Sequence, residues 1–230
     1  MKKTNFEILN EYLLALQRVD SLEKMDAYVA EITDAVDNVY PCISCKTGCY
    51  TCCTGASVPT VYAKEWQRIR EYLKTLPEET QKAIKEKNEG MYSRHEEILN
   101  FIHGVITQVA TMDDLKTFAK RMMEELKEES CPMHINGKCS IYEVRPTKCR
   151  IFGYFSFVYD NKVQMLSCSS DINKMQDYLE QQRTKQIALP FWNYLENKLI
   201  NFVLDESEKY NMTAIPIWLK NDLETGKLEI

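Results

Sequence analysis

Most of this chain carries apolar residues at helical spacing. Over Asn5–Asp20, for example, apolar residues recur every three or four positions, which places them on one face of a helix. Pro77 followed by two glutamates is typical of a helix start, because proline fits the first turn. The predicted helical segments are Asn5–Asp20, Ser21–Asn38, Val58–Leu76, Pro77 to about Glu129, Ile172–Ile187 and Phe191–Leu204.

A single stretch has the pattern of a sheet. Aromatic and β-branched runs at Tyr154–Tyr159 and Val163–Leu166 flank the polar residues 160–162, which suit a turn. We expect a β-hairpin there, and we expect Leu223–Ile230 to form a charged tail. The predicted fold class is therefore mainly α, a helical domain with one small β-hairpin.

The length of the chain favours one domain with a helical extension. Its 230 residues can bury a core without disulfides. Pro41 ends the first helical region, because the residue before a proline is disfavoured in a helix. We expect residues 1–40 to form an N-terminal helical arm packed on a main domain of residues 41–230, which ends in C-terminal helices.

Composition narrows the class of protein. A hydrophobic content of 44% and a charged content of 27% are typical of a globular chain. No apolar run approaches the roughly 18 residues that span a bilayer, and residues 1–7 turn polar before any signal-like apolar stretch. The net charge of −5 argues against general binding to nucleic acid or anionic lipid. We expect a cytoplasmic protein without a membrane partner.

The nine cysteines need a chemical explanation. Cytosolic thiols stay reduced, so dense cysteine spacing indicates metal binding or catalysis before it indicates disulfides. The cysteines gather in Cys42–Cys53 and Cys131–Cys149, with Cys168 beyond. Thiolates select zinc, copper(I) or iron–sulfur clusters. Adjacent Cys52 and Cys53 are hard to direct at one tetrahedral centre, so they serve two centres or only one of them ligates.

Basic residues stand among the cysteines of this acidic chain. A centre held by four thiolates carries about two negative charges, which nearby cations must offset if the site is partly buried. Charge balance and an ordinary solvated surface are both open interpretations. The basic residues are Lys46, Lys138, Arg145, Lys148 and Arg150.

Two motifs carry a family resemblance. The first is Cys45–Cys53, followed at a distance by Val58 and Glu65, and the second is Cys131–Arg150, which contains Arg145-Pro146. Together they resemble the YkgJ family of cysteine cluster proteins, zinc- or iron-chelating domains with a C-x-x-C-x-x-C-C signature. The resemblance implies that zinc or an iron–sulfur cluster organises the helical domain. The implied metal ligands are Cys45, Cys49, Cys52, Cys53, Cys131, Cys139, Cys149 and Cys168.

Some ligand assignments stay open. Cys42 is left over, and Cys45 and Cys49 are three residues apart where the family's compact motif has two, so either Cys42 or Cys45 is the first ligand. His134 lies between Cys131 and Cys139 as an auxiliary ligand, an open-site base or a plain loop residue. We expect His95 and His103 to be ordinary helix residues.

Three functions fit this pattern. The first is a metal-binding protein that holds zinc or an iron–sulfur cluster in a structural role, with redox chemistry open. The second is a metal-dependent enzyme with its substrate near the hairpin, Arg145 and Arg150; a related cysteine-cluster family includes a flagellin lysine N-methylase. The third is a helical interaction protein clipped by a structural metal, with Phe6–Val39 as the partner-binding arm.

A radical-type enzyme is the other form of the catalytic hypothesis. Cys45-x3-Cys49-x2-Cys52 has the cysteine spacing of radical S-adenosylmethionine enzymes. Such an enzyme needs an alternating βα barrel, whereas this chain predicts long helices and one hairpin. The pattern therefore favours metal binding over this chemistry, and it leaves the substrate and any protein partner unidentified.

Overall fold

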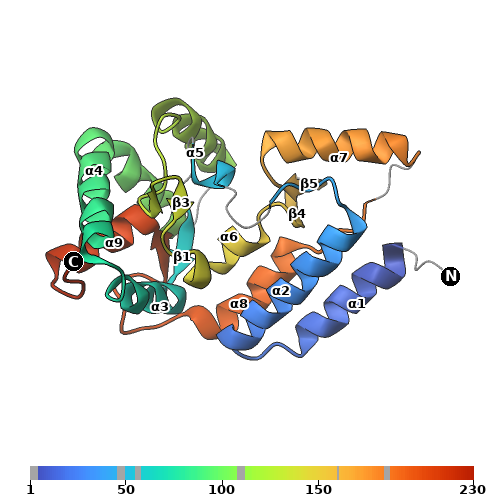
Figure 1. Cartoon of the computed structure of the whole chain (residues 1–230), viewed down its shortest axis with the longest axis horizontal. Coiled ribbons are helices and arrows are strands. Elements are labelled where there is room, and N and C mark those ends of the chain that lie inside the picture. The colour runs from blue at the N-terminus through green and yellow to red at the C-terminus, as the bar shows by residue number, and fades with distance from the viewer. Residues whose placement is uncertain (1–4, 46–49, 55–57, 108–111, 160, 184–186) are drawn as a thin grey trace. The chain divides into compact units, whose positions relative to one another are not determined.

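The computed structural model describes residues 5–45, 50–54, 58–107, 112–159, 161–183 and 187–230 (Figure 1). The predicted mainly α class is confirmed. Its helices are α1 (Asn5–Gln17), α2 (Leu22–Val39), α3 (Ala63–Leu73), α4 (Glu78–Thr107), α5 (Met112–Glu125), α6 (Thr147–Ile151), α7 (Ser169–Gln181), α8 (Trp192–Val203) and α9 (Ile215–Glu224). No helix among the described residues combines the length and apolar character needed to cross a lipid bilayer.

The strands form small antiparallel pairs. The pairs are β1 (Thr60–Tyr62) with β6 (Met212–Ala214), β2 (His134–Ile135) with β3 (Lys138–Cys139), and β4 (Phe155–Tyr159) with β5 (Lys162–Leu166). Short 3-10 turns lie at η1 (Thr51–Cys53) and η2 (Tyr142–Val144). The β4–β5 pair is the predicted hairpin, while the other two pairs were not expected.

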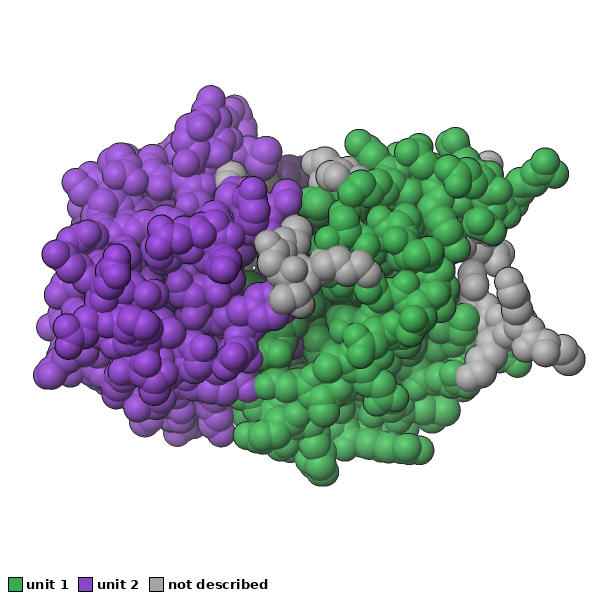
Figure 2. Space-filling model, in the orientation of Figure 1, with its two compact units in different colours: residues 1–49, 149–203 green, residues 50–148, 204–230 purple. Residues whose placement is uncertain are grey.

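The chain divides into two compact units (Figure 2). Unit 1 contains residues 1–49 and 149–203, and unit 2 contains residues 50–148 and 204–230. Each unit is thus built from two stretches that lie far apart in the sequence. The helices α1 and α2 belong to unit 1. The boundary at residue 40 between an arm and a main domain stays a prediction.

Unit 1 is organised by α2 and α8. The hydroxyl of Ser21 accepts a hydrogen bond from the Lys24 backbone N–H at 3.2 Å and so caps the start of α2. The buried face of α2 packs on α8, whose Leu199 is fully buried. Ser156 in β4 donates its N–H to the Pro190 carbonyl at 2.9 Å, which holds the hairpin against the chain entering α8.

Unit 2 is built around two stacked tryptophans. Trp66 of α3 and Trp218 of α9 are fully buried, with ring centroids 5.8 Å apart and planes 11° from parallel. The Trp218 indole N–H donates to the Val61 carbonyl at 3.0 Å, next to the β1–β6 pair. This core therefore joins the segment before α3 to the last residues of the chain.

Two predicted elements of unit 2 were wrong in part. The helix expected from Val58 begins only at Ala63, because Thr60–Tyr62 pairs with β6. The expected charged tail includes the last residues of α9, and Leu228 within it is only 1% exposed. In both places the partners lie too far along the chain for a local pattern to indicate them.

Candidate metal centre

Four of the candidate thiols lie in unit 2, on two segments that are hydrogen-bonded together. The Cys131 N–H donates to the Cys53 carbonyl at 2.8 Å, and Thr54 and Ser130 form an antiparallel bridge beside it. The first cysteine segment is thereby fixed to the second at the level of the backbone. This contact brings together residues that the sequence separates by helices α3, α4 and α5.

The adjacent thiols of the first segment contact each other. Cys52 and Cys53 lie in η1 and share a side-chain hydrogen bond. That bond lowers the pKa of Cys52 to about 7 and raises the pKa of Cys53. Burial and the neighbouring Cys131 and Cys139 raise the pKa of Cys53 further. The two adjacent thiols thus contact each other, and the expectation that they serve two centres, or that only one of them ligates, stays a prediction.

The second segment supplies the other two thiols. Cys131 is 4% exposed and belongs to the buried core around Trp66 and Trp218, which we call the tryptophan core. Cys53 and Cys139 pack against that core. Burial raises the pKa of Cys131 to about 12 and also raises the pKa of Cys139. Burial therefore favours neutral thiols, and a metal that binds them must displace their protons.

His134 shares a strand pair with one of these thiols. It lies in β2 directly opposite Cys139 in β3, so the two side chains project from the same face. Its ring stacks on Tyr50, which precedes η1, with centroids 5.2 Å apart and planes at 19°. The buried Nε2 has no hydrogen-bond partner among the described residues. An imidazole nitrogen without a described hydrogen-bond partner thus lies on the strand opposite Cys139.

Two cations accompany the unit 2 thiols. Lys87 of α4 donates to the His134 carbonyl at 2.6 Å and interacts electrostatically with Cys131 and Cys53. Arg145 lies over the Tyr142 ring at 3.7 Å, and its charge favours the thiolate forms of the thiols at 52 and 139. For the arginine the sequence left charge balance and a solvated surface both open, whereas Lys87 was missed because it lies mid-helix with no local signal.

The remaining described thiols lie in unit 1. They are Cys42, Cys45, Cys149 and Cys168, while the predicted ligand Cys49 and the basic Lys46 fall outside the described residues. Cys168 is the residue before α7, and Cys45 contacts Asp171 in the first turn of that helix. The eight described cysteines divide equally between the two units.

The described sulfur and nitrogen donors lie on neighbouring segments, but their side chains do not yet point at one common position. Across the described ranges, no group of three or more histidine, cysteine, aspartate or glutamate side chains is placed to hold an ion. Ligation in either unit therefore requires cysteine side chains to rotate toward a common point. The chemistry of the donors still fits a thiophilic metal, since soft sulfur ligands and an unpartnered imidazole nitrogen lie on neighbouring segments.

Glu65 supports the second segment from within unit 2. Its carboxylate is 1% exposed and accepts the N–H of Thr147 at 2.7 Å and that of Tyr62 at 3.3 Å. Burial raises the pKa of this carboxyl, and the two backbone donors act in the opposite direction. The residue that the family resemblance singled out thus joins the start of α3 to the start of α6.

The other candidate residues are engaged elsewhere. Arg150 pairs with Asp26 within unit 1, its Nε 3.7 Å from Oδ1, and Lys148 donates to Thr60 within unit 2 at 3.1 Å. His95 bonds Glu129 at 2.8 Å, where non-helical dihedrals kink α4, and His103 bonds Thr213 at 2.8 Å. The last two are therefore structural residues.

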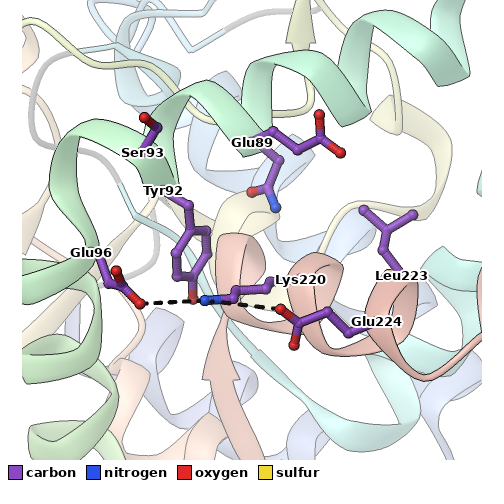
Figure 3. Close-up of a pocket in the computed structure, with 8 residues that line it drawn as sticks. Glu89, Tyr92, Ser93, Glu96, Lys220, Leu223 and Glu224 are labelled. Atoms are coloured by element: carbon purple, nitrogen blue, oxygen red, sulfur yellow. Dashed lines mark ion pairs between the residues drawn. The ribbon is translucent and has the colours of Figure 1, made fainter.

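A surface pocket of unit 2 lies between α4 and α9 (Figure 3). The Lys220 ammonium lies 4.3 Å from the Tyr92 ring centroid, 3.6 Å from Glu96 and 4.0 Å from Glu224. The pocket's own carboxylates thus neutralise its cation. None of the described residues lining it is a cysteine, so it is separate in composition from the candidate metal centre.

Comparison with known proteins identifies one family. The model of the CxxCxxCC family, described as a "putative zinc- or iron-chelating domain", matches residues 44–180. The match contains every cysteine from Cys45 to Cys168, leaves Cys42 outside, and ends within α7. No curated protein and no solved structure matches this chain.

Proposed function

This chain belongs to the CxxCxxCC family of zinc- or iron-chelating domains, and we propose that it binds zinc or an iron–sulfur cluster through the thiolates of its clustered cysteines. The hydrogen bond from the Cys131 N–H to the Cys53 carbonyl carries the proposal, because it joins the two cysteine segments at 2.8 Å. Cys52, Cys53, Cys131 and Cys139 are the proposed ligands in unit 2.

Charge and burial support this ligand set. Lys87 and Arg145 interact with these thiols and would offset the negative charge of a thiolate-bound metal. The tryptophan core shields one side of the set, so water competes less with the ligands. The electrostatic attraction between a metal ion and thiolates is stronger in such a partly buried setting than at an open surface.

The proposed role is structural first. When bound, the metal supplies a crosslink between the η1 turn and the β2–β3 hairpin, and an iron–sulfur cluster would add a site for electrons. Neither segment has a long helix or wide sheet of its own to fix it. The reducing cytoplasm is the proposed setting, since it keeps the thiols available for ligation.

Metal analysis of the full chain tests the proposal. After anaerobic purification we expect stoichiometric zinc, or iron with acid-labile sulfide. Cys139→Ser should lower the metal content and the thermal midpoint together, because ligation and folding are linked. Cys42→Ser, which removes a thiol outside the proposed set, should keep the wild-type metal content.

Alkylation of the wild-type chain covers the case in which the variant fails to fold. Cysteines at positions 52, 53, 131 and 139 should resist modification until a chelator is added. Metal-free wild-type protein with the same alkylation pattern before and after chelation would contradict the proposal. So would a Cys139→Ser protein that folds and keeps its full metal content.

A further inference from the structure

We infer that unit 1 contains a second metal centre, built by Cys45, Cys149 and Cys168 beside Asp171. The inference rests on the proposed function, in that it extends thiolate ligation to a separate set of residues. It divides the eight-cysteine set into two groups, each held together by contacts within its own unit. The chain would then bind two metals rather than one.

The segments that carry Cys45 and Cys168 both contact Asp171 at the start of α7. The Cys45 thiol donates to Asp171 Oδ2 at 3.2 Å, and the neighbouring Ser44 N–H donates to Oδ1 at 3.3 Å. The Asp171 N–H in turn bonds the Cys168 carbonyl at 3.1 Å. Cys45 is thereby fixed beside the helix turn that begins with Cys168.

The third ligand, Cys149, lies within α6, and the chain that follows this helix packs on Cys45. Gly153, four residues after Cys149, lies so close to Cys45 that a Cβ built on it would be 2.3 Å from the sulfur. Its N–H donates to the Leu166 carbonyl at 2.7 Å, and the Tyr154 hydroxyl donates to the Cys45 carbonyl. Three cysteine-bearing segments therefore converge within unit 1.

The same contacts decide which of two cysteines is the first ligand. Cys42 lies against Met175, with the two sulfur atoms 3.9 Å apart. Met175 is one helical turn beyond Asp171 on α7, so Cys42 lies farther from the start of that helix than Cys45 does. Cys45 is the ligand, and Cys42 is the spare thiol.

The donors at this centre suit zinc. Three thiolates and one carboxylate oxygen complete a tetrahedral shell of the kind that zinc accepts. Asp171 is 1% exposed, and the Lys174 ammonium 3.8 Å from its Oδ1 compensates part of the charge. On binding, the thiols of Cys45, Cys149 and Cys168 would each lose a proton to solvent, and Asp171 Oδ2, which accepts the hydrogen bond from the Cys45 thiol, would become free to ligate.

Native mass spectrometry of the anaerobically purified full chain, loaded with zinc, counts the centres. We expect two metals in the wild type and in Cys42→Ser, and one metal in both Cys45→Ser/Cys168→Ser and Cys131→Ser/Cys139→Ser. A metal-free wild type would contradict the proposed function itself. This inference alone would be overturned if Cys45→Ser/Cys168→Ser bound as many metals as the wild type. It would also be overturned if the wild type bound a single metal and both double variants lost that metal.

A glycine variant keeps every ligand and so serves if the double variant fails to fold. Gly153→Ala pushes a methyl group into the Cys45 sulfur and should reduce the count from two metals to one. Gly226→Ala is the matched control, because Gly226 also has a positive φ, +70°, but no atom lies within 4 Å of its added Cβ. Two metals bound with wild-type affinity in Gly153→Ala would overturn the placement of Cys45 at this centre.

Discussion

At the scale of single residues, Glu65 links two segments of unit 2 that lie far apart in the sequence. The family resemblance marked Glu65, but only the fold explains it, since its carboxylate accepts two backbone N–H groups from separate segments. His134 was left open between three roles, and these stay predictions; its buried Nε2 has no hydrogen-bond partner among the described residues. Motifs locate such residues, while their partners come from the fold.

Replacing Glu65 by glutamine should destabilise the chain. Glutamine offers one acceptor oxygen, so its NH2 group would face one of the two backbone donors and leave that donor unpaired. We expect a loss of about 1–3 kcal/mol in the free energy of unfolding, measured by urea denaturation. Glu71→Gln on the same helix removes an exposed ion pair with Lys74 and should change the free energy of unfolding far less. Equal effects of the two variants would contradict the role of Glu65.

The elements followed the hydrophobic pattern where their partners were nearby. The pattern predicted α1, α2, α8 and the β4–β5 hairpin to within a few residues, because an amphipathic face or a short turn is visible locally. It also gave the start of α4 and the presence of α7, but not the end of α4 at Thr107 or the end of α7 at Gln181. It missed β1, which owes its form to β6 far along the chain, and α9. It also gave no sign of the kink in α4 at His95, where φ is −134°.

The kink in α4 is tied to the segment that follows α5. Arg94 and His95 both bond the Glu129 carboxylate, at 2.9 Å and 2.8 Å. Burial opposes the charged form of Glu129, but these two hydrogen bonds outweigh it and lower the pKa of the carboxyl. Its contribution to stability is therefore present above the pKa of the unfolded chain and is lost as the pH falls through the lowered value.

Glu129→Gln tests that contact by its dependence on pH. At neutral pH we expect the variant to be less stable than the wild type by about 1 kcal/mol, since Arg94 is largely exposed. Urea denaturation at decreasing pH should show this difference shrink to nothing. Glu86→Gln, which alters an exposed pair on the same helix, should show little difference at any pH. A pH-independent gap for Glu129→Gln would contradict the assignment.

At the scale of the whole molecule, the cysteines follow the two units. The sequence predicted clustered cysteines from two segments and left the number of centres open, because spacing shows which cysteines are neighbours along the chain but not which unit each joins. The first cysteine segment is divided between the two units. Cys42 and Cys45 lie in unit 1, whereas Cys52 and Cys53 lie in unit 2. The order of elements alone could not indicate this division, since each unit combines stretches from both halves of the chain.

X-ray absorption at the edge of the bound metal, on the anaerobically purified full chain, tests the central claim of thiolate ligation most directly. We predict a nearest-neighbour shell dominated by sulfur at about 2.3 Å, the length of a zinc–thiolate bond. With iron, a second shell of neighbouring iron atoms would identify a cluster. A nearest shell of oxygen and nitrogen without sulfur would contradict the account, because the metal would then be held by residues other than the cysteines.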